Sequence, residues 1–256
     1  MGFMNFLPVQ GHRIEYEFIR VDRDAPVIVF LHEGLGSHAM WRDFPARLAR
    51  AARCSALVYS RYGHGNSDAL AAPRRPDFMH EEGMRALPEL LDKLGVERPI
   101  LFGHSDGGSI ALIYAAAAGR PVTGLIVEAP HVMVEDLSIS SIQESKRIFE
   151  TTDLRQKLAR YHAHPESTFR GWNDIWLAPE FRQWSIEEYL PRLACPVLAI
   201  QGEDDEYGTM RQVERIAESA ADVQVVKLAK CGHTPHRDQP EAVIEAAVRF
   251  VRKCLE

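Results

Sequence analysis

Six short, predominantly apolar segments recur along the chain, and helical stretches lie between them. They occupy residues 27–31, 56–59, 99–102, 124–127, 196–200 and 223–228. An unbroken apolar run is typical of a strand buried on both faces, and intervening helices suit the crossover connections of a parallel sheet. The sequence therefore predicts an α/β fold with a mostly parallel central sheet flanked by helices.

The remaining local patterns extend this prediction. Residues 14–19 alternate between apolar and polar side chains, as an antiparallel edge strand would. Helices are expected over residues 41–51, 77–94, 109–118, 211–219 and 241–254. The last of these has apolar positions at helical spacing, so we expect it to cover the sheet.

Residues 131–190 break the alternation of strands and helices with helical and loop character. This segment holds three of the four tryptophans, Trp172, Trp176 and Trp184. An insertion between two strands predicts a helical cap over the carboxyl edge of the sheet. Residues 1–130 and 191–256 are then expected to form one core.

Charge and cysteine content exclude several classes of protein. The 30 basic and 36 acidic residues give a net charge of -6, which offers no general attraction for nucleic acid or an anionic membrane. The four cysteines form no CxxC pair, and we expect reduced thiols in a cytoplasmic protein. The amino-terminal residues lack an export signal, and no apolar run is long enough to span a membrane. A small-molecule substrate is expected, and the oligomeric state stays open, a homo-oligomer included.

The segment Gly103–Gly108 reads GHSDGG and lies directly between a predicted strand and a predicted helix. This is the G-x-S-x-G pattern in its strand-turn-helix context, where the sharp turn exposes a serine hydroxyl at the edge of the sheet. We therefore predict that Ser105 is a nucleophile. The similar segment around Ser67 has no following helix and is expected to be a loop.

A serine hydroxyl needs a nearby base to take its proton. His233 lies between the last predicted strand and the last predicted helix, so it can reach the sheet edge, and we predict that it is the base. His236 is the local alternative. His104 is expected to make a structural hydrogen bond, and His162 and His164 to have a packing or solvated role rather than to bind a metal.

The third group should be a carboxylate that orients the imidazole. The acidic loop at residues 201–206 follows a predicted strand and precedes His233, which gives the order Ser, Asp, His. We predict Asp205 as this acid, with Asp204 as the next choice. Glu128 is a separate alternative, because it ends another strand at the same edge; its structural role would be a salt bridge beneath the cap.

Backbone N–H groups should bind the negative charge that develops on the substrate oxygen. One is expected from Asp106, which directly follows the nucleophile. The other is expected from the loop after the first parallel strand, at Gly34 or, as second choice, Leu35.

With these landmarks in order, the chain resembles the α/β-hydrolase superfamily over nearly its whole length. In that family the acid is commonly the third residue after the glycine of the loop, which falls on Asp205, and the histidine of a late Gly-His pair falls on His233. Some relatives, including haloalkane dehalogenases, place the acid after the strand that here ends at Glu128. Those dehalogenases use an aspartate nucleophile, whereas this chain has Ser105.

One residue departs from the family pattern. The loop after the first parallel strand usually reads His-Gly, whereas this chain has His32-Glu33. A side chain pointing inward would repel an anionic substrate or shift a neighbouring pKa. We expect Glu33 instead to point outward or to bond a neighbouring loop.

These residues predict a serine hydrolase that cleaves a carboxylic ester of a small, apolar or aromatic substrate without a metal or organic cofactor. The resemblance leaves open a carbon-carbon bond hydrolase acting on a ring-cleavage product and an enol-lactonase. A non-catalytic receptor on the same fold is the alternative from another class.

Overall fold

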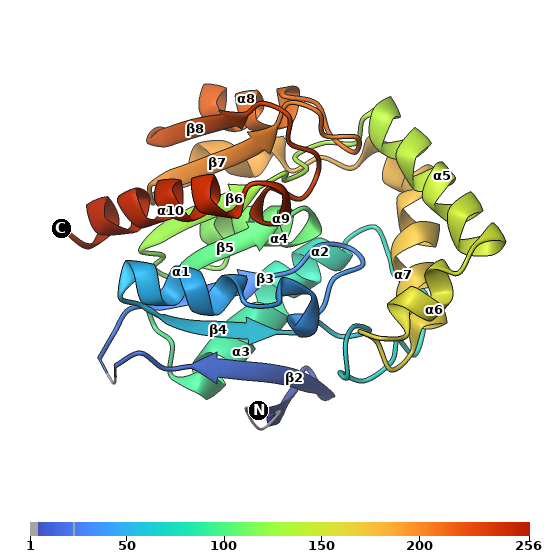
Figure 1. Ribbon diagram of the computed structural model, residues 1–256, viewed down its shortest axis with the longest axis horizontal. Helices are drawn as coiled ribbons and strands as arrows, with labels where there is room; N and C mark the ends of the chain where they lie inside the picture. Colours follow the sequence, from blue (N-terminus) through green and yellow to red (C-terminus); the bar gives the residue numbers. More distant parts are fainter. Residues whose placement is uncertain (1–4, 23) are drawn as a thin grey trace.

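An eight-stranded sheet runs through the middle of the molecule in the order β1-β2-β4-β3-β5-β6-β7-β8 (Figure 1). The structure is a computed structural model that describes residues 5–22 and 24–256. β1 and β2 are antiparallel to their neighbours, and all other pairs are parallel. This arrangement confirms the predicted fold class. The strands are β1 (Asn5–Val9), β2 (His12–Ile19), β3 (Val27–Leu31), β4 (Ser55–Tyr59), β5 (Ile100–His104), β6 (Gly124–Glu128), β7 (Val197–Gly202) and β8 (Val223–Leu228).

All six predicted parallel segments are strands, with shifts of one or two residues at their ends. The first strand of the sheet, β1, was not expected. It carries Pro8, which cannot donate a ladder hydrogen bond and so weakens a strand pattern. As an edge strand it tolerates this proline, and a tight turn through Gln10 and Gly11, both with positive φ, returns the chain into β2.

The helices agree with the sequence pattern except at some of their ends. α1 begins at Phe44 rather than at residue 41, because Arg42 has a φ of 53° and ends a preceding helical turn. α4 begins at Asp106, three residues before the predicted start. The helical elements of the core are η1 (His38–Trp41), α1 (Phe44–Ala52), α2 (Phe78–Glu81), η2 (Glu82–Ala86), α3 (Leu87–Leu94), α4 (Asp106–Ala117), α8 (Arg211–Ser219), α9 (Pro235–Asp238) and α10 (Pro240–Leu255).

Two hydrophobic layers cover the sheet, one on each face. Alternate residues of β3 belong to different layers: Ile28 and Phe30 pack with α1 and α10, whereas Val29 and Leu31 pack with α3 and α4. Because successive side chains of a strand point to opposite faces, a run that is apolar throughout serves both layers. The parallel strands are thereby fixed in register, and their carboxyl ends are aligned along one edge.

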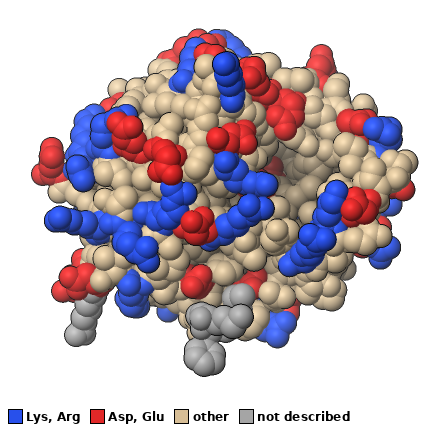
Figure 2. Space-filling view, in the orientation of Figure 1, with Lys and Arg blue, Asp and Glu red and all other residues tan. Residues whose placement is uncertain are grey.

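The cap, residues 131–190, leaves the sheet after β6 and returns before β7. Its helical elements are α5 (Asp136–Thr151), α6 (Leu154–Leu158), α7 (Pro165–Trp176), η3 (Pro179–Gln183) and, across its end, η4 (Glu187–Arg192). Figure 1 shows α5, α6 and α7 standing beyond the carboxyl ends of the parallel strands. In Figure 2 the surface is hollowed between these helices and the sheet, and acidic and basic side chains are interspersed over this face.

Two further observations concern the described part of the chain. None of its helices is both long enough and apolar enough to cross a membrane. The four cysteines are free thiols. Residues 1–4, on which the expectation about export partly rests, lie outside the described residues.

The packing of α1 against α10 and the sheet predicts that a buried and an exposed leucine contribute differently to the free energy of unfolding. Leu48 in α1 is 0% exposed, whereas Leu255 at the end of α10 is 45% exposed. Leu48→Ala should lower the free energy of unfolding by about 2–5 kcal/mol, because it removes buried methyl groups and leaves a cavity. Leu255→Ala should change it by less than about 0.5 kcal/mol. Urea unfolding of both variants measures the difference; equal losses would contradict this packing.

Candidate active site

A sharp turn between β5 and α4 carries Ser105. Its backbone has φ 52° and ψ -121°, a conformation that side chains rarely adopt. The turn is so tight that a Cβ on Gly103 would lie 2.4 Å from the carbonyl oxygen of Gly107, and one on Gly107 would lie 2.1 Å from that of Leu31. Both positions therefore require glycine, and the turn holds Ser105 at the carboxyl edge of the sheet.

The structure brings Ser105, His233 and Asp205 together from three separate loops. The Nε2 atom of His233 lies 2.9 Å from Ser105 Oγ. Its Nδ1 atom lies 2.8 Å from Asp205 Oδ1 and 2.9 Å from Oδ2. With Nδ1–H donating to the carboxylate, Nε2 is left as the acceptor for the serine hydroxyl. The imidazole can therefore take the serine proton.

Several donors keep the Asp205 carboxylate charged and fixed. It accepts hydrogen bonds from Gln201 Nε2 at 2.6 Å and from the backbone N–H groups of Tyr207 at 2.8 Å and Gly208 at 3.2 Å. Burial acts to raise the pKa of Asp205, but the hydrogen bond and charge of His233 and the Tyr207 N–H outweigh it and lower this pKa. Asp204 is exposed and does not join the cluster.

Glu128 lies at the same edge but faces a different histidine. It is fully buried at the end of β6, and its Oε1 atom contacts Nδ1 of His236. The two alternatives that the sequence left open, Glu128 as acid and His236 as base, thus pair with each other. The Ser105 N–H donates to the Glu128 backbone carbonyl at 3.0 Å, but neither the Glu128 nor the His236 side chain makes a hydrogen bond to the side chain of Ser105 or His233 in the described structure.

Of the two arrangements expected for Glu33, the outward one is wrong, whereas a bond to a neighbouring segment is present. Its Oε2 atom lies 3.3 Å from Nδ1 of the buried His104, and its side chain lines the cavity at Ser105. Burial acts to raise the pKa of Glu33, but the hydrogen bond and charge of His104 lower it. The side chain turns inward because His104, at the end of the neighbouring strand, offers a partner that the sequence pattern does not reveal.

His104 is the cationic centre of this part of the site. Burial alone would lower its pKa, but the hydrogen bond to Glu33 and the charges of Glu128 and Glu33 raise it to about 9. Its Nε2–H donates to the backbone carbonyl of His233 at 2.7 Å. Side-chain atoms of His104, Glu128 and His236 lie within 4.8 Å of one another, a spacing that a metal ion could use. Both His104 nitrogens already bond protein oxygens, and Glu128 Oε1 contacts His236, so these residues contact one another as ion pairs.

A cavity of about 140 Å³ lies over Ser105. Cap residues Ile142, Trp172 and Trp176 supply its apolar walls. Gly34 and Leu35, the two candidates for the second oxyanion donor, both line it, and a Cβ on Gly34 would lie 2.2 Å from the Trp172 ring. Asp106 also lines the cavity, as the first residue of α4. The donors are thus expected at Asp106 and Gly34, as the sequence predicts.

Sequence reasoning missed three residues around the site. Gln201 ends β7 at the edge that carries the predicted acid, so its position was a usable signal. His131 and Tyr207 have rings 5.8 Å and 4.8 Å from the His233 ring, and nothing in their sequence context points to this. Burial lowers the pKa of His131 to about 3, so this imidazole is neutral near pH 7.

Of the two cap histidines, His162 has a packing role and His164 is solvated, as expected. His162 is buried, accepts a hydrogen bond from the Gly65 N–H at 3.0 Å and lies 3.0 Å from the carbonyl of Leu35. It therefore connects the cap to the loop that carries Gly34. His164 is exposed at the start of α7.

The raised pKa of His104 predicts a pH-dependent stability. The protonated imidazole is favoured in the folded state, so its contribution is complete below the unfolded pKa of about 6.5 and is lost as the pH rises through about 9. The difference in unfolding free energy between wild type and His104→Gln should shrink over this range by at most about 3 kcal/mol. Urea unfolding at several pH values measures it. The exposed His164→Gln is the matched control and should follow the wild type; a constant difference for His104→Gln would contradict a protonated His104.

Comparison with known proteins places this site in a family. Residues 28–246 match the Alpha/beta hydrolase family. A proline iminopeptidase from Saccharolobus solfataricus is 24% identical over 285 aligned positions, covering 94% of this chain and 89% of the relative. An sn-1-specific diacylglycerol lipase from Mus musculus is 23% identical, covering 93% and 85%. The crystal structure of a proline iminopeptidase from Mycobacterium smegmatis is similar with a TM-score of 0.80 at 18% identity, over 98% of each chain. The chain belongs to the alpha/beta hydrolase family.

Proposed function

We propose that this alpha/beta hydrolase is a serine hydrolase that cleaves a carboxylic ester of a small, apolar or aromatic substrate through an acyl-enzyme. The observation that carries the proposal is the position of His233, with one ring nitrogen 2.9 Å from Ser105 Oγ and the other 2.8 Å from the Asp205 carboxylate. A nucleophile, a base and an orienting acid in this geometry serve acyl transfer.

In the first half of the reaction, His233 Nε2 accepts the proton of Ser105 while Oγ attacks the ester carbonyl carbon. The carbonyl oxygen becomes negative, and the backbone N–H groups of Asp106 and Gly34 stabilise it. Asp205 stabilises the imidazolium that forms. The imidazolium then gives its proton to the departing alcohol oxygen, which leaves the acyl group bonded to Ser105.

In the second half, His233 takes a proton from water, and the resulting hydroxide attacks the acyl carbonyl carbon. The second tetrahedral intermediate collapses when the imidazolium returns a proton to Ser105 Oγ. The carboxylic acid is released, and the hydroxyl is restored. Every proton is carried by His233, so the proposed steps use no metal or organic cofactor.

The cavity supports a small and uncharged acyl group. Its volume of about 140 Å³ is well below the ~300–1,000 Å³ of pockets for drug-sized ligands. Trp172, Trp176 and Ile142 favour an apolar or aromatic group. Glu33, with its lowered pKa, places a carboxylate in the lining and disfavours an anionic group such as a ring-cleavage dienoic acid.

A substrate panel tests this proposal. We expect nitrophenyl esters of short apolar or aromatic acids to be hydrolysed fastest, and Ser105→Ala to lose on the order of 10³-fold or more in kcat. A fluorophosphonate probe should label wild type at Ser105. Ser140→Ala, an exposed serine of α5, is the matched control and should keep both labelling and turnover.

The same panel contains the outcomes that would overturn the proposal. It includes lactones, ring-cleavage dienoates and proline 4-nitroanilide, the last because relatives are named proline iminopeptidases. Faster turnover of any of these than of every ester would replace the ester class. No turnover and no labelling, together with tight small-molecule binding that survives Ser105→Ala, would favour a receptor.

A second comparison tests the choice of acid. Asp205→Asn should lower kcat by about 10³–10⁴-fold, because an amide cannot stabilise the imidazolium and favours the wrong tautomer. Glu128→Gln should keep kcat within about tenfold of wild type, since its carboxylate contacts His236. Initial rates on protein shown to be folded by circular dichroism measure both. The reverse order of losses would move the catalytic acid to Glu128.

A further inference from the structure

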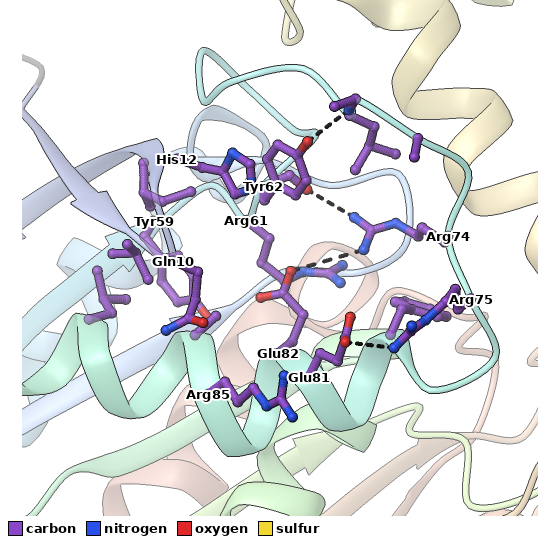
Figure 3. Close-up of a pocket in the computed structure, with 18 of the residues that line it drawn as sticks. Gln10, His12, Tyr59, Arg61, Tyr62, Arg74, Arg75, Glu81, Glu82 and Arg85 are labelled. Carbon is purple, nitrogen blue, oxygen red and sulfur yellow. Dashed lines mark hydrogen bonds and ion pairs between the residues drawn. The ribbon is translucent and has the colours of Figure 1, made fainter.

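A second cavity, larger than the one at Ser105, is drawn in Figure 3. Its volume is about 460 Å³, and it is bounded by β2, the end of β4, the loop at residues 70–75 and the α2–α3 segment. It has no lining residue in common with the cavity at Ser105. This volume falls within the ~300–1,000 Å³ of ligand pockets, so the cavity can hold a whole small molecule.

A buried guanidinium with unused donors lines this cavity. Arg61 is 1% exposed, and its Nη2 atom donates to the backbone carbonyls of His32 at 3.1 Å and Glu33 at 2.9 Å. Its Nε and Nη1 atoms have no hydrogen-bond partner among the described residues, and neither does the buried hydroxyl of Tyr59. Buried donors without acceptors are costly and rare in folded proteins. Arg61 therefore places unpaired donors beside this cavity.

The charged side chains that line the cavity carry a formal positive excess, with Arg61, Arg74, Arg75 and Arg85 against Glu81 and Glu82. Arg74 donates to the carbonyl of Tyr62 at 2.9 Å and lies 4.0 Å from Glu82. Figure 3 shows Arg61 and Arg74 both directed toward Glu82. Burial raises the pKa of Glu82 and also that of Asp106, which faces the same arginines from outside the lining, and burial lowers the pKa of Arg74 to about 10.

Most of the remaining wall is apolar. Val9, Ile14, Phe78 and Leu90 are buried around the cavity and offer no hydrogen-bonding side chain. At one side the rings of His12 and Tyr62 are stacked, with centroids 3.7 Å apart. A ligand that fits this cavity has one polar end and an apolar body.

We propose that this cavity is a second ligand site, which binds a small organic monocarboxylate with its carboxylate at Arg61 and its apolar body against the β2 and α3 walls. The site is independent of ester cleavage at Ser105. A single negative charge is the chemistry that fits, because the two buried guanidiniums already face Glu82. A phosphate dianion would add two charges beside that carboxyl group.

Calorimetric titration with octanoate tests the proposal. The protein is Ser105→Ala, so that binding is measured whether or not the chain is an esterase. We expect octanoate to bind. Octanamide, which has the same shape without the charge, should bind at least about tenfold more weakly. Equal affinity for the two, or no octanoate binding at millimolar concentration, would overturn the proposal.

Three variants locate the bound octanoate. Ala86→Trp, which fills the cavity from the end of η2, should abolish binding, whereas Ala51→Trp on the exposed face of α1 is its matched control and should retain it. Arg74→Gln should weaken the binding of octanoate more than the binding of octanamide. This second variant keeps the test decisive if Ala86→Trp does not fold. In an otherwise wild-type chain, Ala86→Trp should leave turnover at Ser105 unchanged. Undiminished octanoate binding in both cavity variants would place the ligand elsewhere and overturn the proposal.

Discussion

The rest of the site depends on the approach of Gly107 to the carbonyl of Leu31, which is too close for any Cβ. This contact presses the start of α4 against the end of β3 and forces Ser105 into its positive-φ turn. The turn stands at the edge where the parallel strands end, so the loops after β7 and β8 can reach it. The loop after β8 spans the greatest distance, because β8 lies three strands from β5 in the sheet. The Nε2–H of His104 fixes this loop by donating to the backbone carbonyl of His233.

Ionisable groups beneath the site form a compact cluster of ion pairs. The His104 imidazolium lies between Glu33, which it contacts, and Glu128, whose charge also raises its pKa. Glu128 in turn contacts His236. The partly buried carboxylate of Glu33 and the fully buried one of Glu128 are tolerable because each has a histidine partner. Glu33 thereby forms an ion pair with His104, the residue that precedes Ser105.

The sequence predicts the parallel strands well, because a strand buried on both faces leaves an apolar signature that does not depend on its neighbours. It also places Ser105, His233 and Asp205 in loops at one edge, since each directly follows such a strand. Where a feature depends on a partner distant in sequence, the pattern fails. The inward position of Glu33 depends on its contact with His104. The start of α4 is predicted three residues too late, because Gly107 and Gly108 have low helix propensity although both lie in the first turn of the helix. The choice between Asp205 and Glu128 needs the three-dimensional contacts, because both end strands at the same edge.

The connection from β6 to β7 has a consequence for shortening the chain. These neighbouring strands are parallel, so β6 ends at the carboxyl edge whereas β7 begins at the opposite edge. The distance between those points is about 17 Å for a strand of five residues. The last part of the cap, η4, covers it by packing on α4 and α8. Excision of residues 131–190 would therefore remove most of η4 together with α5, α6 and α7, and it would leave only residues 129–130 and 191–196 to return the chain to β7. A shortened chain that keeps η4 retains the packing of this return on α4 and α8.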